Sequence, residues 1–116
     1  MSSFISFTNQ RDGLPLDEQP LVALHLWRVI ETTDGERYIL AIMPGGAQRL
    51  TSALVSFDPV TGTATTTSGR RYEFHEAPSN DALVCEVFAQ RLIYSNLQAA
   101  RDVSDAMWQE FQAQKK

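Results

Sequence analysis

The chain has few of the residues that build covalent or metal-linked frameworks. Its 116 residues include one cysteine and two histidines, so an internal disulfide and an all-cysteine zinc site are excluded. A single cysteine is typical of a reducing compartment, and we expect a cytoplasmic protein. The first ten residues lack the features of a secretory signal, and no uncharged apolar run approaches the roughly 18 residues of a membrane span. We therefore expect no membrane association.

Basic residues are also scarce. Ten lysines and arginines are outnumbered by fourteen acidic residues, which gives a net charge of −4 and a pI of about 5.0. Such a chain has no global attraction to nucleic acids or anionic lipids. Residues 36–75 are the exception, because they carry four arginines against three acidic residues. Only this stretch is a candidate for attracting an anionic partner.

The composition is that of an ordinary globular protein, with 43% hydrophobic and 21% charged residues. A chain of this length is expected to form one domain whose core needs no disulfide or metal. Changes in composition divide it into three parts. We predict a polar N-terminal arm over residues 1–20, an antiparallel β-sheet over residues 21–76 and a C-terminal helical segment over residues 77–116.

Turn residues divide the central part into five strands. Asp34-Gly35 is a strong two-residue hairpin signal, and the sequence from Asp58 to Gly62 is typical of a bulged hairpin turn. Ser68-Gly69 marks a further turn. Successive hairpins of this kind predict a five-stranded antiparallel meander, with strands over residues 22–32, 36–43, 49–57, 63–67 and 70–75.

The C-terminal part is predicted to be helical because residues 81–113 contain no proline or glycine and carry an apolar stripe. Ser79 or Asn80 is expected to cap the helix. One continuous helix would be roughly 50 Å long, which exceeds the width of so small a sheet. We therefore favour a break near Asp102, with Ser104 as a second cap; the alternative is a distal half that projects to a partner.

These elements predict an α+β fold. The five-stranded antiparallel meander is either open or curled into a small barrel, and a C-terminal helix or two helices cover it. The strands over residues 22–32 and 36–43 are apolar on both faces near their centres. Strands of this kind are expected to be covered on both sides.

No residue pattern predicts a catalytic, cofactor or metal site. His25 and the pair His75-Glu76 are the only candidates for a metal cluster, but zinc sites need three or four converging ligands. Cys85 could act as a nucleophile only beside a base and in an electropositive setting. Its apolar neighbours instead predict a buried, inert side chain.

The hairpin around Ser68 is the best local candidate for anion binding. Hydroxyls, turn amides and guanidinium groups are suited to phosphate, and a basic sheet face with aromatic residues is typical of small barrels that bind single-stranded nucleic acid. The alternative is a solvated hairpin with no ligand. The candidate contacts for an anion or a nucleic acid are Arg49, Thr67, Ser68, Arg70 and Arg71.

The last predicted helical turns carry three large apolar residues, Met107, Trp108 and Phe111. Such residues near a terminus either fold back onto the core or dock onto a partner. If the distal helix does not pack on its own sheet, it is an interaction helix. We consider both alternatives.

Part of the sequence resembles a loose group of small bacterial and phage-associated proteins. The resemblance covers residues 25–75, where an Arg-x-Thr-Ser strand at residues 49–52 precedes a Thr-x-Ser-Gly-x-x-Tyr-like hairpin at residues 66–72. Trp27, Glu36 and Tyr38 fit the preceding hairpin of that group. The resemblance implies no activity and no functional residue.

The sequence favours a non-enzymatic protein that acts by binding another protein, as a regulatory or inhibitory factor of bacterial or phage origin. A homodimer through the C-terminal helices is one form of such binding. The first alternative is a small β-barrel that binds nucleic acid through its basic hairpin face. The second is a small-ligand binder or enzyme with a site between sheet and helix, near His25, His75 or Glu86.

Overall fold

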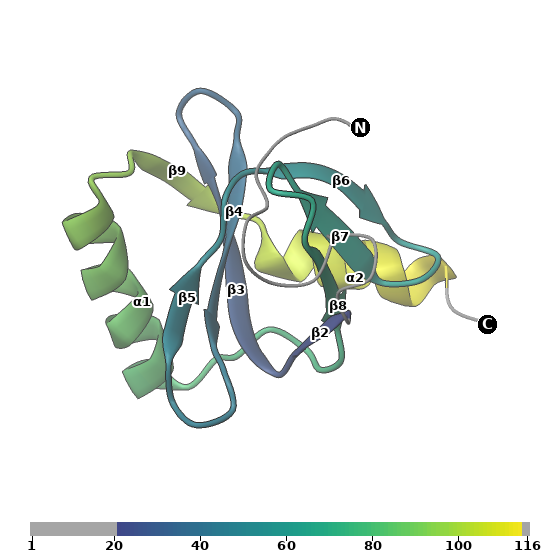
Figure 1. Ribbon diagram of the computed structural model, residues 1–116, viewed down its shortest axis with the longest axis horizontal. Coiled ribbons are helices and arrows are strands. Elements are labelled where there is room, and N and C mark those ends of the chain that lie inside the picture. Colours follow the sequence, from purple (N-terminus) through teal and green to yellow (C-terminus); the bar gives the residue numbers. More distant parts are fainter. Residues whose placement is uncertain (1–20, 115–116) are drawn as a thin grey trace.

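A computed structural model describes residues 21–114, which form strands and two helices (Figure 1). The predicted N-terminal arm, residues 1–20, lies outside the described residues. The elements in chain order are β2 (Val22–Leu24), β3 (Leu26–Thr32), β4 (Arg37–Ile42), β5 (Gln48–Leu50), β6 (Leu54–Asp58), β7 (Thr63–Thr66), β8 (Arg71–Phe74), α1 (Ala82–Ser95), β9 (Ala99–Asp102) and α2 (Ser104–Gln114).

The strands form two four-stranded sheets. One sheet has the order β5-β4-β3-β9 and is antiparallel throughout. The other has the order β2-β8-β7-β6, in which β2 pairs with β8 in parallel and the remaining pairs are antiparallel. The α+β class and the predicted antiparallel hairpins are therefore confirmed. The single five-stranded sheet is wrong, and the described residues form no closed barrel.

The chain passes from one sheet to the other at two points inside predicted strands. His25 separates β2 from β3, and residues 51–53 separate β5 from β6. Thr51 shows how the second crossing is held. Its backbone N–H donates to Ile39 O (3.0 Å), while its hydroxyl oxygen accepts from Ile39 N–H (3.1 Å). The Thr51 hydroxyl thus takes the place of a backbone carbonyl in the pairing with β4. The chain leaves β4 directly after this residue.

Side-chain alternation gives β3 and β4 two buried faces. Trp27, Val29 and Ile39 face a core between the two sheets, which also includes Phe74 from β8 and Met107 from α2. The opposite face contributes to a second cluster, which is made by Ile30, Leu40 and, from α1, Phe88. Alternate residues of a strand point to opposite faces. The prediction that these strands are covered on both sides is confirmed.

The C-terminal part contains two helices, as the expected break near Asp102 requires. The cap of α1 is Asp81 rather than Ser79 or Asn80, because the Asp81 carboxylate accepts from the N–H groups of Leu83 (2.9 Å) and Val84 (3.2 Å). The helix ends at Asn96, whose φ of 63° is left-handed. A strand was not predicted here, yet β9 lies between the helices and pairs with β3.

Candidate interaction surface

The three apolar residues of α2 fold back onto the core. Met107 is buried, and the ring of Trp108 lies 6.3 Å from that of Trp27 and 5.3 Å from that of Phe111. Phe111 covers Gly62, where a Cβ atom would lie 2.6 Å from the Phe111 ring. Of the two alternatives for Met107, Trp108 and Phe111, the structure therefore shows packing on their own sheets. Their docking onto a partner would require α2 to move.

The hairpin between β7 and β8 already uses its turn amides. The N–H groups of Thr67, Ser68 and Gly69 donate to Ala53 O (2.8 Å), Ser52 Oγ (3.4 Å) and Thr66 O (2.8 Å), respectively. The backbone donors that would line an anion site are therefore engaged within the protein. Thr67 and Arg71 are exposed, while Arg49 and Arg70 are half-buried. Binding of an anion or nucleic acid by these side chains stays a prediction.

Two histidines distant in sequence meet at the ends of β2 and β8. The parallel register of these strands places His25 beside His75, with ring centroids 5.3 Å apart. Each ring contacts a carboxylate: His25 Nδ1 lies 3.0 Å from Glu76 Oε2, and His75 Nε2 lies 2.9 Å from Glu73 Oε1. Within residues 21–114, no group of three or more histidine, cysteine or acidic residues has a geometry that could hold a metal ion.

The Arg28 side chain links β3, β9 and the segment that enters α1. Its guanidinium forms two hydrogen bonds to the Asp102 carboxylate (3.0 and 3.1 Å), and its Nη1 donates to Ser79 O (2.8 Å) and Asn80 Oδ1 (3.1 Å). The hydrogen bond to Asp102 raises the pKa of Arg28 despite partial burial. Burial alone would raise the pKa of Asp102, but hydrogen bonds from Arg28 and Ser104 outweigh it and lower that pKa.

A cavity of about 190 Å³ lies next to this network, between α1 and β3-β4. Apolar side chains dominate its wall, and Cys85 reaches it from the first turns of α1. The Cys85 residue is exposed, and its thiol lies 3.7 Å from Ser79 O. The prediction that Cys85 is buried is therefore wrong, because α1 turns Phe88 rather than Cys85 toward the sheet.

Asp102→Asn is expected to lower the free energy of unfolding by about 1 kcal/mol at neutral pH, since the carboxylate is partly exposed and screened by solvent. A folded-state pKa below the ordinary value of about 3.9 contributes stability that is present above that value and lost as the pH falls through the folded pKa. Urea unfolding at several pH values should show the wild type and the variant converging below about pH 4.

Asp105→Asn is the matched control, because Asp105 lies 3.9 Å from Arg28 and is more exposed than Asp102. It should change stability less at every pH. A pH-independent difference between the wild type and Asp102→Asn would contradict the role of the ionised carboxylate.

A second ion-pair group crosses the β5-β4-β3-β9 sheet, which we call the outer sheet, at Glu31 of β3. The two carboxylate oxygens of Glu31 contact Arg101 Nε (2.6 Å) on β9 and Arg37 Nε (3.2 Å) on β4. Both arginines lie directly opposite Glu31 in the neighbouring strands. Hydrogen bonds from Arg101 and then Arg37 lower the pKa of Glu31. These ion pairs connect β3, β4 and β9, and both oxygens of the Glu31 carboxylate have partners within the chain.

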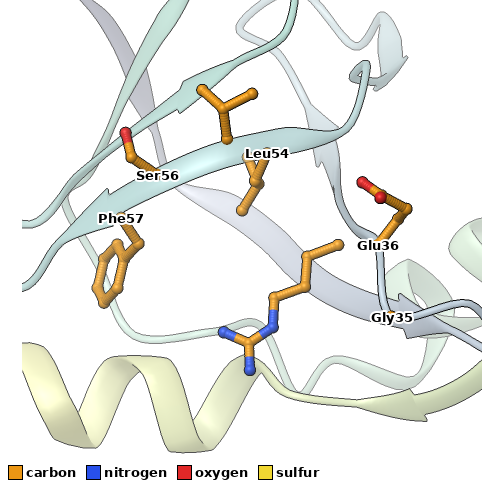
Figure 2. A pocket seen from close by; sticks show the side chains of 7 residues that line it. Gly35, Glu36, Leu54, Ser56 and Phe57 are labelled. Carbon is orange, nitrogen blue, oxygen red and sulfur yellow. The ribbon is translucent and has the colours of Figure 1, made fainter.

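Arg37 also lines an open cavity of about 190 Å³ between β6 and the turn that joins β3 to β4. Figure 2 shows Leu54, Ser56 and Phe57 on the β6 side, opposite Gly35 and Glu36 of the turn. The lining combines apolar side chains with charged groups of both signs.

The largest exposed apolar side chains of the helices lie on α1. The exposed fractions of Leu83, Ile93 and Tyr94 are 77%, 71% and 85%. The helix lies beside the β5-β4-β3-β9 sheet, and no described element covers its other side (Figure 1). We call this side the α1 outer face; its exposed residues are Leu83, Glu86, Gln90, Ile93 and Tyr94, and the half-buried Val87 and Arg91 form its border with the sheet.

A cavity of about 270 Å³ runs along this face next to β5. Its walls include Gln48 and the α1 residues Glu86, Val87, Arg91 and Tyr94. The Nε atom of Arg91 is buried and has no hydrogen-bond partner within residues 21–114. A buried donor without an acceptor costs about 1–3 kcal/mol. Atoms of the same chain shield this donor, and the exposed residues in the cavity wall are Gln48, Glu86, Gln90 and Tyr94.

The sequence contains a signal for this face. Leu83 and Ile93 belong to the apolar stretch that predicts a helix over residues 81–113, yet both are exposed. Apolar residues of α1 in fact occupy more than the roughly 100° that one buried stripe requires. Only the side carrying Phe88 is buried.

No family model, no curated protein and no solved structure matches the chain. Neither helix within residues 21–114 has the length and apolar character needed to cross a membrane.

Proposed function

We propose that the protein acts by binding another protein and that the α1 outer face is the contact surface. The observation that carries the proposal is the exposure of Leu83, Ile93 and Tyr94 on one helix whose opposite side is buried in the core. Exposed apolar groups gathered on one face are typical of interaction sites. Regulation or inhibition of the bound protein needs no catalytic residue.

The position of the surface differs from the one that the sequence favours. Met107 and Trp108 are engaged with the core of their own chain, so within residues 21–114 α1 is the helix whose exposed side carries large apolar residues. An amphipathic helix that presents apolar residues at three- and four-residue spacing fits the helix-in-groove and helix-pair modes of recognition.

The Leu83→Glu variant tests this proposal. Leu83 is in the first turn of α1, where an acidic side chain is compatible with the helix dipole, so the variant should fold normally. Affinity capture from cells should recover specific proteins with the wild type and lose them with Leu83→Glu. We expect at least a tenfold loss, which corresponds to about 1.4 kcal/mol of binding free energy.

Val60→Glu is the matched control, because Val60 is also apolar and 66% exposed but lies in the turn between β6 and β7. It should capture the same proteins as the wild type. Equal capture by Leu83→Glu and the wild type would refute α1 as the contact surface, and a wild type that binds no protein would refute the function.

A further inference from the structure

Four residues on one side of α1 follow the spacing of a two-helix seam; three of them are exposed, and Val87 is half-buried against the sheet. Leu83, Val87, Gln90 and Tyr94 are separated by four, three and four residues, which aligns them along one side of the helix. Glu86 lies on one flank of this line, and Arg91 lies on the other. Phe88 lies off this line and is buried against the sheet.

The two charged flanks show which arrangement of two such helices is favoured. In a parallel pair, the Glu86 flank of one helix meets the Arg91 flank of the other. A residue on the first flank then contacts the residue five positions later in the partner helix. Glu86 and Arg91 have this separation, so symmetry would form the same ion pair twice. In an antiparallel pair, like flanks meet, and Arg91 would find no carboxylate.

The cavity beside α1 favours the same arrangement. Arg91 is half-buried and lines this cavity together with Glu86 and Val87. A carboxylate that a second molecule brings to this wall would pair with the Arg91 guanidinium group. Charge-assisted hydrogen bonds of this type are among the strongest that side chains form.

We propose that the α1 outer face binds a second copy of this chain, with the two α1 helices parallel and Glu86 of each copy paired with Arg91 of the other. The inference rests on the proposed use of the α1 outer face for protein binding and names a second copy of the chain as the protein that this face binds. Leu83, Val87 and Tyr94 supply the apolar contacts, and Gln90 meets its own copy at the centre. A buried polar residue at such a seam position sets the register of the pair.

The contact covers about two heptads of a 14-residue helix. An interface of this length buries little area compared with obligate dimers. The dimer is therefore reversible and dissociates on dilution. Light scattering on the purified full chain should show the mass rising from monomer to dimer as the concentration increases.

A disulfide experiment tests the helix direction. In the Cys85→Ser background, Gln90→Cys places a thiol where the two copies face each other in the parallel pair, so mild oxidation should give a covalent dimer. Ala89→Cys in the same background is the control, because Ala89 is exposed but off the seam. We expect cross-linking at least ten times faster for residue 90 than for residue 89; equal rates would overturn the parallel pair.

Charge reversal tests the ion pair. Glu86→Arg and Arg91→Glu should each weaken dimerisation about tenfold, and the double variant should restore it, because the pair is rebuilt with its signs exchanged. Failure of the double variant to recover would overturn the proposed contact. Val60→Glu should leave the dimer unchanged.

The outcomes also separate this inference from the proposed function. A wild type that stays monomeric at every concentration, yet captures other proteins that Leu83→Glu loses, refutes the homodimer and leaves the function standing. A wild type that neither dimerises nor captures a protein refutes both.

Discussion

Replacing Trp27 with alanine should lower the free energy of unfolding by about 3–5 kcal/mol, the range observed for large aromatic residues in cores. Trp27 is fully buried, and its ring centroid lies 4.4 Å from that of Phe74 and 6.3 Å from that of Trp108. These rings come from β8 and α2, so one side chain joins β3 to the second sheet and to the last helix. Chemical denaturation followed by far-ultraviolet circular dichroism measures the loss.

The Trp27→Phe variant separates packing from hydrogen bonding at this position. It keeps an aromatic ring but loses the hydrogen bond from Trp27 Nε1 to Glu76 O (2.7 Å). A loss of about 1–2 kcal/mol is expected, because the Glu76 carbonyl loses its donor and some ring volume is lost. A Trp27→Ala variant no less stable than Trp27→Phe would show that the aromatic contacts do not stabilise the core.

Replacing Ser104 with alanine should lower the free energy of unfolding by about 2 kcal/mol, because it leaves a buried backbone donor without its acceptor. The Val29 N–H donates to Ser104 Oγ (2.7 Å), and the hydroxyl donates back to Val29 O (3.3 Å). Ser104 is fully buried at the start of α2. Amide hydrogen exchange should localise the loosening to β3, β9 and the first turn of α2.

Ser95→Ala is the matched control for this substitution. The Ser95 hydroxyl donates to Arg91 O (2.8 Å) one turn earlier in the same helix. A bond of this kind contributes little, and alanine is the better helix former, so the change should be within about 0.5 kcal/mol. A similar loss for Ser95→Ala and Ser104→Ala would contradict a special role for the contact between Ser104 and Val29.

The β-hairpins follow from local chemistry. Gly35, Gly62 and Gly69 have φ values of 87°, 69° and 89°, and each lies in a turn predicted from its neighbours. Left-handed backbone is readily adopted by glycine and costs other residues more. A few adjacent residues therefore decide where each strand reverses, and such positions can be read without knowledge of the rest of the chain.

The strand β9 shows where local chemistry fails. Ala99-Ala100-Arg101-Asp102 has good helix formers and continues the stretch without proline or glycine. It is extended because its contacts lie some 70 residues earlier in the chain, where Glu31 binds Arg101 and Arg28 binds Asp102. Because all four residues of β9 are exposed, the strand pairing with β3 and these ion pairs outweigh a propensity of less than about 1 kcal/mol per residue.

The division into two sheets is also a tertiary effect. Residues 22–32 read as one apolar strand, but the chain bends at His25. Just before the bend, Leu24 O accepts from His75 N–H (3.1 Å) in the second sheet. The pairing of β2 with β8 is parallel and joins the beginning of the described chain to its middle. No turn residue encodes a contact of such long range.

The sequence by itself determined the α+β class, the hairpins and the two helical segments, because turn residues, caps and apolar spacing act over a few neighbouring positions. Only the tertiary structure decided which helix keeps an exposed apolar side. Both α1 and α2 carry apolar residues, and Met107 and Trp108 suggested α2 as the interaction helix. The core between the sheets buries Met107, whereas the outer sheet covers only the Phe88 side of α1. Exposure thus depends on which surfaces meet, and that is set by contacts between distant parts of the chain.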